Sequence, residues 1–272
     1  MNAVTFIHDS AATYHATKAL SKSSMDELLK CPALFKQTLD TMGGDHAATP
    51  AMILGSVFHS MTLEPEFLDA EYAPRQNAGN TKAAKEEAAK AAENGITLVQ
   101  RETWATCEAM RDAANAHPLL KAAKAAEDWQ AEVSIYWQER EMIPCKARVD
   151  ALATIPGFGL CAIDLKSTTD ASPDAISRHL YDYGYHRQAA WYTHALRLVG
   201  FEPRQFVFLF VEKTAPYLST AVSVSDGAMC LALEEIRSAL KRYEDCAASG
   251  TWPGYTQDII TEIDLPAWAY RR

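Results

Sequence analysis

Two acidic residues and a lysine have the types and spacing needed for metal-assisted hydrolysis. Asp164-Leu165-Lys166 lies in an apolar run typical of a strand, and because strand side chains alternate, Asp164 and Lys166 share one face. Asp150 lies near the end of the preceding run, and across a hairpin centred near Gly157 every register with an even index sum puts it on that face. The sequence therefore predicts that two carboxylates and a lysine converge.

This arrangement favours a divalent cation site. Two carboxylates at one point in a sheet repel each other unless a cation bridges them, and oxygen ligands favour Mg²⁺ or Mn²⁺. A lysine beside such a metal can polarise a water for attack on a phosphodiester. The alternative is a surface strand whose Asp and Lys form an exposed ion pair of little value. The apolar neighbours Ala162, Ile163 and Leu165 argue against an ordinary solvated strand.

The elements that must position these residues follow from hydrophobic periodicity. After residue 130 the pattern shortens to strand-like runs, and the predicted strands are 131–138, 145–153, 160–167, 206–212 and 218–225. Helical periodicity occurs between and after them, and the predicted helices are 174–181, 185–199 and 228–246. The expected core is a mixed sheet flanked by helices, of the α/β (α+β) class.

The first part of the chain is predicted to be helical. Ser23 or Ser24 can cap a helix that runs to about Leu39 and bends near Pro32. Further helices are expected at 51–63, which carries His59, at 81–93 and at 101–116. We expect one domain over 1–272, made of a helical part at 1–125, a catalytic sheet core at 126–250 and an irregular tail at 251–272.

Composition narrows the class of protein. The chain has 272 residues, of which 48% are hydrophobic and 22% charged, as in a soluble globular protein. The sequence shows no apolar run long enough for a membrane span, so we expect a cytoplasmic protein without membrane contact. The net charge of −9 argues superficially against a nucleic-acid partner. However, the segment 75–124 carries eight basic residues against six acidic ones, which allows a locally basic groove.

The six cysteines contain no C-x-x-C pair, so neither a zinc ribbon nor a disulfide framework is indicated, and we expect reduced core thiols. The sequence also lacks a G-x-x-x-x-G-K-[ST] loop, so no nucleotide cofactor is expected.

Four elements in order resemble a known nuclease class. Asp150, thirteen further residues and then Asp164-x-Lys166 resemble the PD-(D/E)xK superfamily. Gln188-Ala-Ala-Trp-Tyr192 is similar to the Q-x-x-x-Y element of its RecB-like branch, and Gly55-Ser-Val-Phe-His59 resembles the upstream histidine of that branch. Each helical element alone is also compatible with an ordinary structural helix. Together they favour a restriction-endonuclease-like core.

Motifs along most of the chain narrow the resemblance to RecE-type exonucleases, the exodeoxyribonuclease VIII family of phages and prophages. The matching segments are Tyr14-His15, Leu20 to Ser24, Cys31 to Phe35, Ala51 to Gly55, Phe58-His59, Leu63 to Pro65, Glu132 to Ser134, Cys145 to Asp150 and Tyr185 to Gln188. The resemblance implies processive degradation of the 5′ strand of linear double-stranded DNA, which depends on Mg²⁺, or on Mn²⁺ in its place, and leaves 3′ overhangs. It also implies a homo-oligomeric ring, with a tetramer favoured over a trimer, and a RecT-like single-strand annealing partner.

The resemblance also assigns roles by position. His59, Asp150 and Asp164 would hold the metal, with the Leu165 carbonyl as an extra ligand. Lys166 would activate or orient the attacking water.

Other positions receive less specific roles from the same resemblance. Gln188 and Tyr192 would position the DNA strand. Glu132 would either help to bind a second metal or be an edge charge. Candidates for phosphate contacts are Ser23, Arg148, His186 and Arg187.

Several alternatives stay open. Cys31-Pro32 invites comparison with the iron–sulfur members of the RecB-like branch, but their cluster needs three more cysteines near the C-terminus and only Cys230 and Cys246 lie there, so no cluster is expected. A structure-specific or 3′-directed nuclease would carry the same motifs. A non-catalytic DNA-binding or assembly protein could retain the fold, and in a soluble α/β protein the site could be coincidental.

Overall fold

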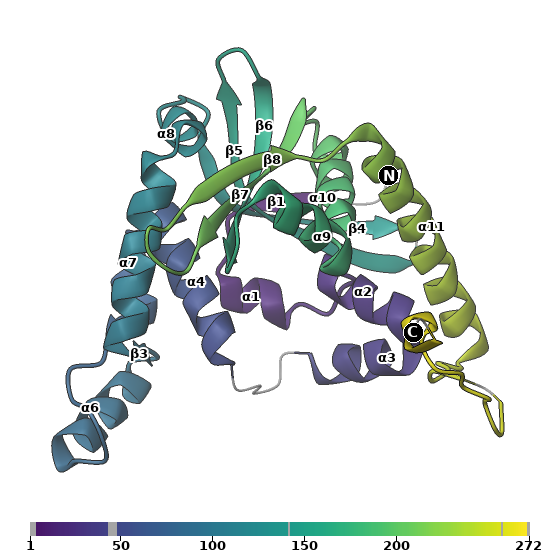
Figure 1. Ribbon diagram of the computed structural model, residues 1–272, viewed down its shortest axis with the longest axis horizontal. Helices are drawn as coiled ribbons and strands as arrows, with labels where there is room; N and C mark the ends of the chain where they lie inside the picture. Colours follow the sequence, from purple (N-terminus) through teal and green to yellow (C-terminus); the bar gives the residue numbers. More distant parts are fainter. Residues whose placement is uncertain (1–3, 43–47, 141, 257, 271–272) are drawn as a thin grey trace.

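A six-stranded sheet forms the centre of the computed structural model, which describes residues 4–42, 48–140, 142–256 and 258–270. The strands follow the order β1-β4-β5-β6-β7-β8 (Figure 1). Their bounds are Thr5–Ile7, Gln130–Glu139, Ile143–Ile155, Gly159–Thr168, Gln205–Glu212 and Ser219–Ser223. Two further strands, β2 (Tyr72–Pro74) and β3 (Thr97–Val99), form a separate parallel pair.

One parallel pairing interrupts an otherwise antiparallel sheet. β6 and β7 run parallel, while every other neighbouring pair in the sheet is antiparallel. A parallel connection needs a crossover, and α9 (Pro173–Asp182) and α10 (Tyr185–Leu198) supply it. The sequence places Gln188 and Tyr192 on this crossover, next to the strand that carries Asp164 and Lys166.

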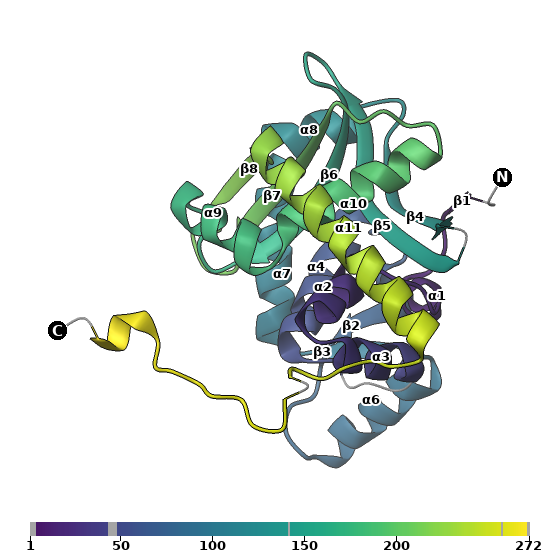
Figure 2. The same ribbon diagram turned by 90° about the vertical axis from the view of Figure 1, so that its right-hand side faces the viewer.

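Helices cover both faces of the sheet (Figures 1 and 2). One core packs the sheet against α2 (Lys22–Lys30), α3 (Pro32–Thr41), α10 and α11 (Asp226–Ser249). The opposite core packs it against α4 (Pro50–Leu63), α7 (Arg101–Ala116) and α8 (Pro118–Lys124). The remaining short helices are α1 (Ala11–Ala16), α5 (Leu68–Glu71), α6 (Lys82–Glu93) and the 3₁₀ turn η1 (Ala267–Tyr270). Because both faces are covered, β5 is buried almost throughout.

The helix predicted to run from residue 23 to 39 is two helices. Cys31 is extended, with φ of −162°, and Pro32 begins α3 because its missing N–H is harmless in a first turn. The cap predicted at Ser23 or Ser24 is instead Ser21, whose side chain accepts a hydrogen bond from the Ser24 backbone while the Ser24 side chain binds the Ser21 backbone. The sequence prediction was wrong about this junction.

Several short elements escaped the sequence prediction. β1 pairs with β4 and so extends the sheet with residues from the first part of the chain. α1, α5, α8, β2 and β3 were also missed, because elements this short carry too few periods to recognise. The mixed α/β class and the long elements are confirmed, with α7 at the predicted bounds and α11 longer than expected at both ends.

None of the helices that the structure describes has the length and apolar character required to cross a lipid bilayer. All six cysteines are unpaired, and all but Cys230 are buried.

Candidate active site

Three carboxylates form a row across the centre of the sheet. The pair Ala151 and Ile163 fixes the register between β5 and β6, so Asp150 lies opposite Asp164. Flanking pairs between β4 and β5, such as Val133 with Val149, place Glu132 opposite Asp150. Glu132, Asp150 and Asp164 are 8%, 8% and 1% exposed. Hairpin register therefore brings together acidic groups that are far apart in the sequence.

Glu132 has a backbone conformation that is unusual for a strand. Its φ is 51°, in the left-handed region, and the ladder between β4 and β5 omits the Glu132–Asp150 pair. A non-glycine residue held there costs about 1–3 kcal/mol, and such strain concentrates at functional sites. Arg148 Nε donates a 2.6 Å hydrogen bond to Glu132 Oε2 and so fixes the carboxylate.

His59 reaches this row from α4. Thr49 caps the helix and Pro50 begins it, while the buried Val57 and Phe58 hold it against the sheet. His59 Nδ1 lies 3.4 Å from Asp150 Oδ2 and 3.6 Å from Glu132 Oε1. One potential ligand atom from each of the three residues lies within 4.8 Å of the other two. The described residues thus offer an N,O,O cluster suited to a divalent cation.

Leu165 connects the histidine to the carboxylates through its backbone. Its N–H donates a 2.8 Å hydrogen bond to Asp150 Oδ2, and its carbonyl lies 2.7 Å from His59 Nε2 and accepts a hydrogen bond when that nitrogen is protonated. The carbonyl that the resemblance assigns as a metal ligand therefore borders the cluster.

The charges in this row perturb one another. Burial and the neighbouring Asp164 raise the pKa of Asp150 to about 7. Burial opposes the charge on His59, but Asp150 and Glu132 outweigh it and raise the imidazole pKa to about 9. Without a cation, the site is thus expected to hold a proton on His59 at neutral pH.

Asp164 is held apart from the three-residue cluster. Its Oδ1 pairs with Lys166 Nζ, and its Oδ2 accepts a hydrogen bond from Gln188 Nε2. Oδ1 lies within ion-pair distance of Lys166 Nζ, but it is buried and has no hydrogen-bond partner of suitable geometry among the described residues. This oxygen can therefore still accept a hydrogen bond or contact a cation. The structure therefore gathers His59, Glu132 and Asp150, whereas the resemblance groups His59 and Asp150 with Asp164.

The residues present fit a hard divalent cation. Asp164 Oδ1 is buried without a hydrogen bond from the part of the chain that the structure describes, and Asp150 lies between the two acidic neighbours Glu132 and Asp164, a repulsion that a bound Mg²⁺ or Mn²⁺ would offset. Glu132, for which the sequence left two roles open, contributes one of the clustered oxygens. Its place in the cluster follows from the β4–β5 register, which residue spacing alone does not give.

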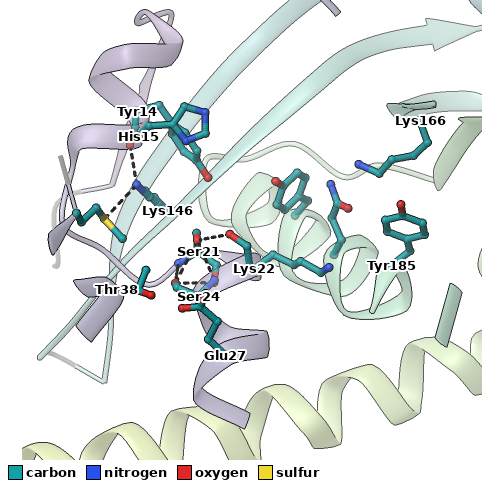
Figure 3. Close-up of a pocket in the computed structure, with 14 residues that line it drawn as sticks. Tyr14, His15, Ser21, Lys22, Ser24, Glu27, Thr38, Lys146, Lys166 and Tyr185 are labelled. Atoms are coloured by element: carbon teal, nitrogen blue, oxygen red, sulfur yellow. Dashed lines mark hydrogen bonds between the residues drawn. The ribbon is translucent and has the colours of Figure 1, made fainter. Parts of the chain in front are cut away.

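A cavity of about 390 Å³ opens beside Lys166 and extends between α2 and α10 (Figure 3). Gln188 and Tyr192, one helical turn apart, both line it, as the Q-x-x-x-Y likeness predicts for residues that meet the substrate. Sequence reasoning gave no part in substrate binding to the other residues of its wall, although most lie in the matching motifs. These are Tyr14, His15, Ser21, Lys22, Ser24, Glu27, Thr38, Met42, Lys146 and Tyr185.

Lysines and aromatic rings alternate along this cavity. Lys22 Nζ lies 5.5 Å from the centre of the Tyr185 ring, and Lys166 Nζ lies 5.2 Å from the same ring. Lys146 Nζ donates hydrogen bonds to the carbonyls of Tyr14 and Thr17, at 2.6 and 2.8 Å. Burial lowers the pKa of Lys146 to about 8. The wall therefore offers cations and stacking surfaces, the two groups that bind single strands of nucleic acid.

The residues suggested for phosphate contacts occupy different environments. Ser23 lines the cavity and is exposed. Arg148 is buried in ion pairs with Glu132, Asp9 and Glu64. Phosphate contact by any of these residues stays a prediction, and for Arg148 it would require these pairs to open.

The other two candidates for phosphate contacts share an acidic partner. His186 Nε2 and Arg187 Nη1 both contact Glu235 Oε2, at 2.8 and 2.7 Å, and Arg187 Nε also donates to Asp26 Oδ1. These contacts join α10 to α11 and α2, which gives both residues a structural role in this conformation.

The comparison with protein families identifies the class of this fold. A family described as a PDDEXK-like domain of unknown function, DUF3799, matches residues 21–262. The chain belongs to the DUF3799 family. The predicted membership of the PD-(D/E)xK superfamily is thereby confirmed, while the narrower likeness to RecE stays a prediction. No curated protein matches this DUF3799 chain significantly in sequence.

Similar solved structures include one that shares the fold. A protein from Eubacterium rectale that carries the provisional name exonuclease is 13% identical, with a TM-score of 0.62 over 97% of this DUF3799 chain and 98% of its own. A phage-related exonuclease from Haemophilus somnus 129PT is 12% identical and covers 89% of this chain and 100% of its own, with a TM-score of 0.34. The first likeness shows a shared fold over almost the whole of both chains.

Proposed function

We propose that this DUF3799 protein is a Mg²⁺-dependent exodeoxyribonuclease that degrades the 5′ strand of linear double-stranded DNA. The observation that carries this proposal is the convergence of Asp150, Asp164 and Lys166 on one face of the sheet, with His59 and Glu132 beside them. Carboxylates and a lysine in this order are the chemical groups needed for metal-assisted hydrolysis of a phosphodiester.

The chain's own residues divide the work. His59, Glu132 and Asp150 would hold the cation, with Asp164 and the Leu165 carbonyl at its border. The bound cation would polarise the phosphate and a water molecule. Burial opposes the charge on Lys166, but Asp164 and Asp150 outweigh it and raise its pKa, so Lys166 stays an ammonium group that orients water and phosphate. Gln188 holds the Asp164 carboxylate in place.

The motifs that resemble RecE-type enzymes support the choice of an exonuclease, and the structural relative from Eubacterium rectale carries an exonuclease name. By the same resemblance we propose 3′ overhangs as the product, a homo-oligomeric ring, and a RecT-like annealing protein as partner. A structure-specific or 3′-directed nuclease is the second candidate, because its metal site would be the same.

Separate labels at each strand end test the polarity. Linear duplex DNA labelled at the 5′ or the 3′ ends is incubated with Mg²⁺ or with EDTA. The proposal predicts Mg²⁺-dependent release of 5′-terminal mononucleotides and a surviving 3′ single strand, with closed circles intact. Release from 3′ ends or cutting of circles would favour the second candidate, and no cleavage with any divalent metal would favour a DNA-binding or assembly role.

A further inference from the structure

The tail that follows α11 exposes a row of large apolar side chains. Ile259, Ile260, Ile263 and Leu265 are 102%, 87%, 86% and 63% exposed. Figure 2 shows the tail extending away from the body of the protein. Four such side chains in one short segment form an apolar surface that favours burial against another surface.

The tail sequence has the alternation of a half-buried strand. In Ile259-Ile-Thr-Glu-Ile-Asp-Leu265 the odd positions are Ile, Thr, Ile and Leu, whereas the even positions are Ile, Glu and Asp. If the segment is extended, its odd positions form one apolar face and its acidic residues point the other way. The pattern is therefore suited to pairing with the edge of a sheet.

The same chain carries an apolar groove beside a sheet edge. A cavity of about 550 Å³ lies between α8 and the outer strands, lined mainly by apolar residues that include Leu119, Ala122, Phe158, Val207 and Ala221. β8 forms this end of the sheet and pairs with β7 alone among the described strands. An edge strand next to an apolar groove can accept an added strand whose side chains fill the groove.

The tail of one chain is too short to place Ile259 in its own groove. Trp252 is fixed against Phe35 and Tyr243, with ring centres 5.5 and 5.6 Å apart, and the Pro253 carbonyl accepts a hydrogen bond from Ala33. This anchor lies at the end of α11, whose 24 residues span about 36 Å.

The groove lies beyond the opposite end of that helix, since β8 precedes α11 directly. The six residue-to-residue steps from Pro253 to Ile259 reach about 21 Å when the chain is fully extended. They fall short of the length of the helix, so Ile259 of the same chain cannot occupy the groove.

We propose that the tail of one copy adds as a strand to β8 of a second copy and places Ile259, Ile263 and Leu265 in its groove. The contact joins two different surfaces, so successive copies form a ring, a reciprocal pair or an open filament. This proposal does not depend on the nuclease activity. The apolar faces of the tail and the groove would both be buried in the assembly.

Two adjacent isoleucines provide a matched test. Ile259→Asp puts a charge on the face that enters the groove, while Ile260→Asp puts the same charge on the outward face. Light scattering of the wild-type chain is expected to give a multiple of 30.0 kDa. Ile259→Asp should weaken association about 100-fold or more, because an unpaired carboxylate cannot be buried there, and give single chains. Ile260→Asp should retain the wild-type mass.

A groove variant completes the test. Phe158, which is 54% exposed, can be changed to Asp without disturbing the core. Phe158→Asp alone should be monomeric. Mixed with Ile259→Asp it should form a two-chain complex, because the first variant keeps an intact tail and the second keeps an intact groove. A wild-type mass of one chain, equal effects of the two isoleucine variants, or no complex in the mixture would overturn the proposal. Circular dichroism checks that every variant is folded.

Discussion

At the scale of single residues, the site combines groups that disfavour one another in the metal-free protein. Glu132 adopts a left-handed conformation, and Asp150 faces acidic neighbours on both adjacent strands. Strain and repulsion of this kind are tolerated where they create a binding site. We therefore expect the metal-free site to lower the stability of the fold and to favour the binding of a cation.

Asp150→Asn tests whether the metal-free site lowers the stability of the fold. The raised pKa of Asp150 means that its surroundings disfavour the ionised form, whereas asparagine is neutral and keeps an acceptor for the Leu165 N–H. We expect the variant without metal to be about 1 kcal/mol more stable at pH 8, which corresponds to about 2–4 °C in melting temperature. Addition of Mn²⁺ should raise the melting temperature of the wild type and leave that of the variant unchanged. A variant that melts below the wild type in EDTA would contradict the account.

The proton on His59 makes metal binding depend on pH. Its pKa of about 9 means that the imidazole is charged at pH 7.5, while a metal ligand must be neutral. Binding of Mn²⁺ should therefore release about one proton, and affinity should rise as the pH approaches 9. Calorimetry in two buffers of different ionisation enthalpy measures the released proton. In His59→Gln, the heat of Mn²⁺ binding should be the same in both buffers. The same heat in both buffers for the wild type would contradict a role for His59 as a ligand.

At the scale of elements, α2 forms one wall of the cavity beside Lys166, and the first turn of α2 holds this wall in place. Ser21 and Ser24 cap each other's backbone there, and Lys22 extends from this turn toward Tyr185 (Figure 3). Ser21→Ala should lower the free energy of unfolding by about 1 kcal/mol because it leaves a helix N–H without a partner. Ser23→Ala, on the exposed side of the same turn, is the matched control. Urea denaturation compares them, and equal losses would refute the assignment of the cap.

Element length determines how much could be predicted from the sequence. The strands around Asp150 and Asp164 and the helix with Gln188 are long and strongly periodic, so their types were evident. The hairpin near Gly157 fixed the relative face of the two aspartates in advance. The sequence left two roles open for Glu132, because its approach to the site depends on the β4–β5 register and on a left-handed residue. The junction at Cys31 was missed because a proline in a helical pattern can bend a helix or start one.

At the scale of the whole molecule, the two helical layers contribute different parts of the site. The layer with α4 brings His59 to the carboxylate row, and the layer with α2 and α10 builds the cavity that leads to Lys166. A net charge of −9 is compatible with DNA binding, because cationic groups are concentrated in the cavity wall. The site therefore receives His59 from one helical layer and Gln188 from the other.

The most direct test of the central claim is cleavage of linear duplex DNA by Lys166→Met in Mg²⁺. Methionine keeps a long apolar stem but removes the ammonium group, so we predict a rate lower by about 10³-fold with Mn²⁺ binding and folding retained. Lys241→Met, at an exposed position on α11, should cleave like the wild type. Wild-type cleavage by Lys166→Met, or wild-type activity that persists in EDTA, would contradict a metal-dependent nuclease site at this row of carboxylates.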